Sequence, residues 1–107
     1  MMGSKGDKSD LERLRQEIDD LDNQIIHLLN QRMHLVQKIA TFKRSAGKDP
    51  MDLTREQAIF RRLAKRNTGP LPWGAVKKIF GEILAASRDI QSSLGASDQR
   101  SSQGNRT

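Results

Sequence analysis

Apolar residues recur at alternating spacings of three and four between residues 11 and 42, the period of one face of an α-helix. We call the nine residues of this series the seam: Leu11, Leu14, Ile18, Leu21, Ile25, Leu28, Leu35, Ile39 and Phe42. Ser9 or Asp10 is a suitable N-cap, and Ala46-Gly47 is a suitable end. A helix over 9–45 would be about 54 Å long, and no other feature constrains the fold as strongly.

Two shorter helices are expected after this long one. The second starts near Thr54, which has capping-box spacing to Gln57, and it stops at the sequence NTGP of residues 67–70. The third begins near Pro72 and ends before Gly95. Because only 4% of the residues are aromatic and 30% are charged, packed amphipathic helices are favoured over a sheet. The expected fold class is therefore all-α, with three helices.

The helices fall within a single expected domain at 9–94. Residues 1–8 and 95–107 are rich in Gly, Ser and charge, so we expect disordered tails, the second of which is also suited to a linker. No apolar run is long enough for a membrane span, and the N-terminus lacks the apolar centre of a signal peptide. With no Cys, disulfides and thiolate metal sites are excluded. A cytoplasmic protein without membrane contact is the expectation.

The length of the first helix favours association of two chains. A globule formed by a chain of this size has a diameter of roughly 34 Å. A helix of about 54 Å is longer than this, so part of its seam would lie in water. A homodimer whose long helices pair antiparallel or cross would cover the seam economically.

Arg32 interrupts the seam, because it stands where the spacing requires an apolar residue. It is either a register-setting or snorkelling polar residue or a ligand for an anion, since a buried guanidinium without an anion is very costly. Lys43 follows eleven residues later on the same side of the helix, with its Cα about 16 Å away. Taken alone, Lys43 is typical of a solvated helix end. Together the two long side chains are able to hold one small dianion.

The other two helices carry similar interruptions. Ser87 and Gln91 lie one turn apart on the apolar stripe of the third helix. Ser87 alone is typical of a hydroxyl bonded back to its own helix, whereas a buried Gln has four hydrogen-bonding positions to satisfy. Arg55 and Glu56 fall in the opening turn of the second helix, which Asp52 is able to cap.

A cation-rich pocket for a small polycarboxylate explains these interruptions jointly. Residues 9–94 contain 15 basic and 11 acidic residues, and this net charge of +4 suits an anionic small molecule or nucleic acid. No glycine-rich phosphate loop or metal-ligand spacing competes with that pocket. His27 and His34 are expected at the surface or rim.

The sequence resembles the all-helical chorismate mutases of the AroQ type from about residue 11 to residue 94. The resemblance rests on LRQEIDDLDNQIIHLLNQR at 14–32, FK at 42–43, DLTRE at 52–56 and IFGEILAASRDIQ at 79–91. It implies an intertwined homodimer of three-helix chains without a cofactor or metal. Members of this family convert chorismate to prephenate by a Claisen rearrangement, on the way to phenylalanine and tyrosine.

The resemblance also implies four catalytic residues. Lys43 and Gln91 would donate hydrogen bonds to the ether oxygen of chorismate. Arg32 would bind a carboxylate, and Glu56 would accept the hydrogen bond of the ring hydroxyl. A pericyclic reaction of this kind needs a held conformer and donors at the ether oxygen, rather than a nucleophile or a proton shuttle.

Four further substrate-binding residues follow from the same resemblance. Arg15 would reach a carboxylate from the partner chain, and Asp52 would contribute its backbone N–H. Arg55 and Ser87 would support the carboxylate end. Arg15 and Lys43 are 28 residues apart, about 42 Å along one helix. They therefore cannot contact the same small molecule within one chain, which agrees with a site shared by two chains. Antiparallel pairing centred near Leu29 would bring them level, and so give two composite sites.

Two alternatives remain open at this point. Related proteins of the same fold remove pyruvate from isochorismate, and they also have a pocket lysine, although Arg55, Glu56 and Ser87 fit the mutase pattern better. A non-enzymatic basic helical dimer would use outward cations, with nucleic acid as one partner. Those cations are Arg61, Arg62, Lys65, Arg66, Lys77 and Lys78. That alternative leaves Arg32, Ser87 and Gln91 unexplained, so no nucleic-acid partner is expected.

Overall fold

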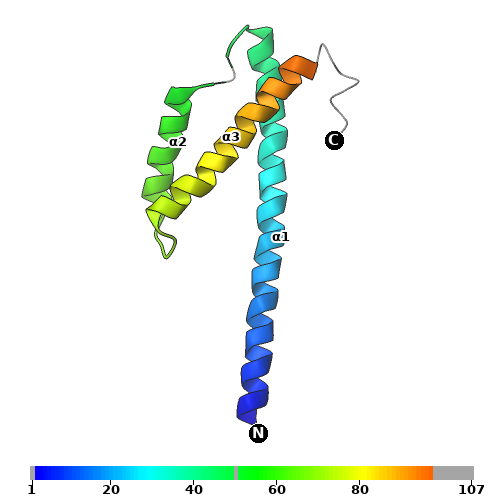
Figure 1. The fold of residues 1–107 in the computed structure, drawn as a ribbon, viewed down its shortest axis with the longest axis vertical. Helices are drawn as coiled ribbons and strands as arrows, with labels where there is room; N and C mark the ends of the chain where they lie inside the picture. Colours follow the sequence, from blue (N-terminus) through cyan, green and yellow to red (C-terminus); the bar gives the residue numbers. More distant parts are fainter. Residues whose placement is uncertain (1, 50, 98–107) are drawn as a thin grey trace. The chain divides into compact units, whose positions relative to one another are not determined.

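Three helices make up the part of the chain that the computed structural model describes, residues 2–49 and 51–97 (Figure 1). They are α1 (Met2–Ser45), α2 (Leu53–Arg66) and α3 (Trp73–Ser97). No strand occurs within those two ranges, so the expected all-α class with one very long helix is confirmed. The expected C-terminal tail at 95–107 falls largely at residues 98–107, outside the described residues. Residues 2–8 of the expected N-terminal tail lie in α1 instead.

The start of α1 differs from the sequence-based expectation. An N-cap at Ser9 or Asp10 is wrong, because the helix begins at Met2 and continues through both residues. Asp10 instead pairs with Arg13 at 3.4 Å, and Arg13 also contacts Glu17 at 3.2 Å. Acidic and basic residues three or four positions apart stabilise the outside of a helix. The acids of this segment therefore serve the body of the helix rather than its end.

The ends of the helices otherwise follow local signals. Gly47 has a φ of 68°, which glycine adopts readily, and it ends α1 as expected. The cap of α2 is Asp52 rather than Thr54, because the Asp52 carboxylate accepts a 2.9 Å hydrogen bond from the Arg55 N–H. Asn67 ends α2, whereas α3 continues to Ser97 and so passes the expected stop at Gly95.

We expect Asp52→Ala to lower the free energy of unfolding by about 1 kcal/mol, because it removes the acceptor for an otherwise unpaired N–H of α2. Asp52→Asn keeps a capping oxygen and is expected to lose much less. Urea unfolding followed by circular dichroism measures both changes. Equal unfolding midpoints for the Ala variant and the unmodified chain would contradict the capping role.

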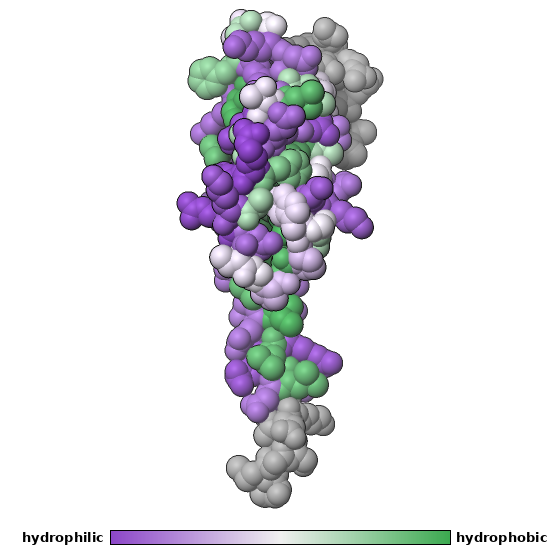
Figure 2. All heavy atoms as spheres, turned by 90° about the vertical axis from the view of Figure 1, so that its left-hand side faces the viewer, coloured by the Kyte–Doolittle hydropathy of each residue, from purple (hydrophilic) through white to green (hydrophobic). Residues whose placement is uncertain are grey.

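The chain divides into two units, residues 1–32 and 33–107. In the first unit, α1 exposes the seam: Leu14 is 50% exposed and Leu28 is 59% exposed. Figure 2 shows apolar residues in green at the surface of this stretch, beside charged residues in purple. The first unit therefore offers an apolar helix face that nothing within it covers.

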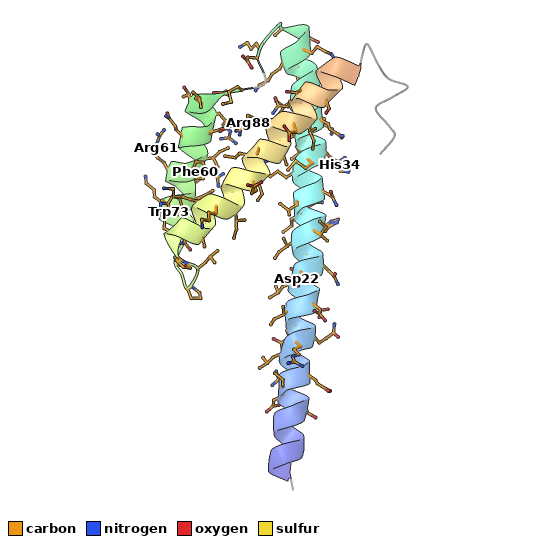
Figure 3. All side chains as sticks on the ribbon, in the orientation of Figure 1. Asp22, His34, Phe60, Arg61, Trp73 and Arg88 are labelled. Atoms are coloured by element: carbon orange, nitrogen blue, oxygen red, sulfur yellow. The ribbon has the colours of Figure 1, made fainter. Side chains whose placement is uncertain are left out.

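The second unit contains the core. Phe60 of α2 and Trp73 of α3 meet edge to face with ring centroids 6.4 Å apart (Figure 3), a favourable aromatic geometry. Five apolar residues are buried in this unit: Val36, Ala40, Ile59, Val76 and Leu84. No described helix of the chain is both long and apolar enough to cross a membrane.

The stretch of α1 in the second unit does not bury the seam. Val36 and Ala40 are each 6% exposed, whereas Phe42 is 75% exposed and Leu35 and Ile39 are also exposed. The helix therefore has two apolar stripes there, and only the one beside the seam packs within the chain. The seam remains available for another partner.

Candidate functional site

Ser87 is the first of the two polar residues that interrupt the apolar stripe of α3. It is buried at 5% exposure, and its hydroxyl donates a 2.9 Å hydrogen bond to the carbonyl of Ile83. This bond back to its own helix is the local interaction that serine commonly makes. The hydroxyl also lies 3.7 Å from the sulfur of Met33, which brings α1 beside this face of α3.

Gln91 lies one turn further along the same face. Its side-chain oxygen Oε1 is sealed from solvent and has no hydrogen-bond partner among the described residues. An unsatisfied buried acceptor costs about 1–3 kcal/mol, so its presence in a native fold calls for an explanation, of which a functional role is one. A carboxamide presents an oxygen acceptor and an N–H₂ donor from the same position by rotation. The Gln91 oxygen is therefore buried without a partner from the described part of the chain.

Glu56 of α2 and Arg88 of α3 form an ion pair that the sequence analysis missed. Arg88 Nη1 donates to Glu56 Oε2 at 2.5 Å, and the side chains are only 18% (Glu56) and 32% (Arg88) exposed. Figure 3 shows Arg88 on the side of α3 that faces α2. One signal was present in the sequence, because Arg88 follows the buried Leu84 by one turn and precedes Gln91 by one turn.

The remaining predicted residues lie on α1 and at the start of α2. Lys43 is half-buried near the end of α1, and Asp52 and Arg55 are exposed around the N-terminus of α2, joined by the capping hydrogen bond. Arg15 and Arg32 belong to the first unit, where Arg15 is exposed and Arg32 is half-buried. The contacts of the second unit thus connect Glu56 to α3 and Ser87 to α1.

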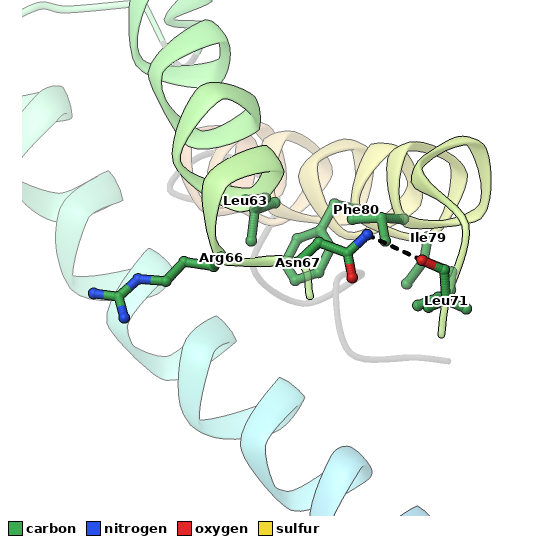
Figure 4. A pocket seen from close by; sticks show the side chains of 7 residues that line it. Leu63, Arg66, Asn67, Leu71, Ile79 and Phe80 are labelled. Carbon is green, nitrogen blue, oxygen red and sulfur yellow. Dashed lines mark hydrogen bonds between the residues drawn. The ribbon is translucent and has the colours of Figure 1, made fainter. Parts of the chain in front are cut away.

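A separate apolar hollow of about 230 Å³ lies where α2 meets α3 at the loop between them. Its lining is Leu63, Arg66, Asn67, Leu71, Val76, Ile79 and Phe80. In Figure 4 the Asn67 amide is bonded to the carbonyl of Leu71 at 3.0 Å, and the Arg66 guanidinium extends away from the apolar walls. The hollow contains none of the predicted site residues. Among the described residues, no group of His, Cys, Asp or Glu is arranged to hold a metal ion.

Known proteins resemble this chain in both sequence and fold. Residues 14–92 match the sequence model of the family described as chorismate mutase type II. The solved structure of a chorismate mutase (form II) from Thermus thermophilus superimposes with a TM-score of 0.75 at 34% sequence identity. That comparison covers 77% of this chain and 93% of the Thermus chain.

Two curated relatives are bifunctional chorismate mutase/prephenate dehydratases. The protein from Aquifex aeolicus is 32% identical over 89 residues, which cover 79% of this chain and 25% of the relative. The protein from Neisseria gonorrhoeae is 34% identical over 71 residues, which cover 66% of this chain and 19% of the relative. This chain therefore spans a quarter or less of the length of these two relatives.

Proposed function

Because the chain belongs to the chorismate mutase type II family, we propose that it converts chorismate to prephenate by a Claisen rearrangement. The observation that carries this proposal is the Gln91 amide, which interrupts the apolar stripe of α3 with its Oε1 sealed and without a partner among the described residues. A ligand with an ether oxygen accepts a hydrogen bond from this carboxamide when its N–H₂ is turned toward the ligand. Such a donor is needed where negative charge develops as the C–O bond stretches.

The other predicted residues supply what a flexible dianion requires. Lys43 adds a full positive charge at the ether oxygen, and Glu56 accepts the hydrogen bond of the ring hydroxyl. Arg32 and the partner chain's Arg15 bind the carboxylates in charge-assisted contacts. The carboxylate end of the substrate is supported by the backbone N–H of Asp52 and by Arg55 and Ser87. These contacts accelerate the reaction by holding the reactive conformer.

The position of the cations on α1 supports a site shared by two chains. At 3.6 residues per turn, Arg32 and Lys43 fall between the exposed seam and the stripe of buried Val36 and Ala40. The two cations therefore follow the border where packing within the chain stops. A second copy that covers the seam would enclose both of them. Its α1, running antiparallel, would bring its own Arg15 level with Lys43.

Mixing two inactive variants tests this sharing. Arg15→Ala and Lys43→Ala are each expected to be nearly inactive alone, because every site of either homodimer lacks one cation. A heterodimer of the two has one complete site, so random re-association at equal amounts is expected to restore roughly a quarter of the unmodified activity, as two-fold symmetry requires. Steady-state rates after unfolding and joint refolding measure the recovery.

Two controls accompany the mixing experiment. Each variant refolded alone is expected to stay inactive, and sedimentation equilibrium is expected to give a dimer for both. A mixture as inactive as its components would contradict a site composed from two chains, and a monomeric chain would contradict the dimer itself.

The proposed activity is tested directly with the purified chain. Incubation with chorismate is expected to remove the absorbance of chorismate and to produce prephenate, identified by its acid-catalysed conversion to phenylpyruvate. A parallel incubation with isochorismate is expected to release no pyruvate. Pyruvate release in that arm, with chorismate left intact, would overturn the mutase activity in favour of a lyase.

A further inference from the structure

The Glu56–Arg88 ion pair uses only one oxygen of the carboxylate. Arg88 Nη1 contacts Oε2 at 2.5 Å. The second oxygen, Oε1, accepts no hydrogen bond from any residue that the structure describes. A carboxylate offers about four acceptor positions, so a contact to Oε2 leaves Oε1 able to accept a further donor. The ion pair therefore holds the Glu56 carboxylate and leaves acceptor positions on Oε1 for another donor.

Both partners are anchored by the core of the second unit. Glu56 lies one turn before the buried Ile59 on α2, and Arg88 lies one turn after the buried Leu84 on α3. Their side chains are 18% and 32% exposed, so solvent screens this pair less than an exposed pair such as Arg13–Glu17, at about 60% exposure each. The orientation of the carboxylate is consequently tied to the packing of α2 against α3.

We propose that Arg88 is a positioning residue for catalysis: it holds the Glu56 carboxylate with Oε1 directed at the ring hydroxyl of the substrate. This inference rests on the proposed function, in which Glu56 accepts that hydroxyl. The contact to Arg88 restricts the rotation of the carboxylate before substrate arrives, so less entropy is lost when the hydroxyl binds. Without Arg88 the carboxylate rotates freely, and the hydroxyl is held in the reactive geometry for a smaller fraction of encounters.

A double-mutant cycle distinguishes this role from a simple link between two helices. Arg88→Gln is expected to lower kcat/KM for chorismate by about tenfold to a hundredfold, the range that small misplacements of a positioned group produce. Arg88→Lys keeps the charge and a donor but not the shape and reach of the guanidinium, and is expected to recover part of the loss. In a Glu56→Gln background, Arg88→Gln is expected to change kcat/KM by less than about twofold, because it acts through a partner already altered.

The substrate provides a second cycle. For a chorismate analogue whose ring hydroxyl is replaced by hydrogen, Arg88→Gln and the unmodified chain are expected to react at nearly equal rates. Arg61→Gln is the matched control, since Arg61 is an exposed cation that Figure 3 shows on the side of α2 away from α3. Arg61→Gln is expected to leave kcat/KM unchanged for both chorismate and the analogue. Thermal unfolding reports whether each variant is folded under assay conditions.

The outcomes separate this inference from the proposed function. Equal losses from Arg88→Gln in both Glu56 backgrounds and with both substrates would mean that Arg88 acts only through the fold, and would overturn the inference. The same holds if folded Arg88→Lys and Arg88→Gln both retain full activity. An unmodified chain that does not consume chorismate would overturn the proposed function, and this inference with it.

Discussion

Replacing Arg32 by Ala is expected to remove nearly all activity, lowering kcat/KM for chorismate by about a thousandfold. The guanidinium is half-buried on α1, and in the proposed site it holds a carboxylate through charge-assisted hydrogen bonds. Loss of one such donor from a preorganised site typically costs a factor of about 10²–10³, and alanine also releases one end of a substrate that must be held at both ends. Steady-state kinetics over a wide range of chorismate concentration measures the change.

Lys38→Ala is the matched control for this experiment. Lys38 is an exposed cation on the same helix, and its loss is expected to change kcat/KM by less than about twofold, since a solvated charge outside a site contributes little. Thermal unfolding and sedimentation show whether Arg32→Ala still folds and dimerises. A folded, dimeric Arg32→Ala with near-normal kcat/KM would contradict the placement of this cation at the dianion.

Gln91→Glu is expected to confine activity to acidic pH. The neutral amide donates a hydrogen bond to the ether oxygen at every pH, whereas a carboxyl donates only while it is protonated. A glutamic acid has an ordinary pKa of about 4.3, so donation is present below that value and disappears as the pH rises through it. At pH 7 the ionised carboxylate would also repel the developing charge, and the loss there is expected to be about a hundredfold or more.

The measurement is a pH profile of kcat/KM from about pH 4 to pH 9 for the unmodified chain and two variants. Gln91→Met fills a similar volume without a donor, so we expect it to remain poor at every pH. A Gln91→Glu profile parallel to that of the unmodified chain would remove Gln91 from the reaction. Partial activity of Gln91→Met equal to that of Gln91→Glu at acidic pH would assign the effect to shape instead.

Much of the fold could be predicted because helices are specified locally. The three-four spacing of apolar residues indicated the long first helix, and Gly47 and Asn67 marked the ends of α1 and α2 where they occur. The N-cap expected at Ser9 or Asp10 is absent because the helix begins at Met2, and Asp10 pairs with Arg13 within the helix. A capping residue type also occurs inside helices, where its side chain pairs with a neighbour three or four residues away, and residue type alone does not decide between the two.

The candidate site could be predicted only in part. Arg32, Ser87 and Gln91 stood out because each is a polar residue within an apolar stripe, a pattern that the sequence spacing shows. Ser87 then proved to satisfy its hydroxyl within α3, at the carbonyl of Ile83. Gln91 keeps a sealed oxygen without a partner among the described residues. Ser87 and Gln91 interrupt the same stripe, but they differ in whether the side chain finds a hydrogen-bond partner in the described residues. The sequence did not show this difference.

The sequence by itself determined the helices, the seam and the side of α1 on which Arg32 and Lys43 lie, because a helix relates neighbours three and four residues apart through its own backbone geometry. Only the tertiary structure decided that Val36 and Ala40, rather than the seam, pack within the chain. It alone joined Glu56 to Arg88, 32 residues away. Such contacts depend on which face of α2 meets which face of α3, and that choice is made by packing between helices, which no local period encodes.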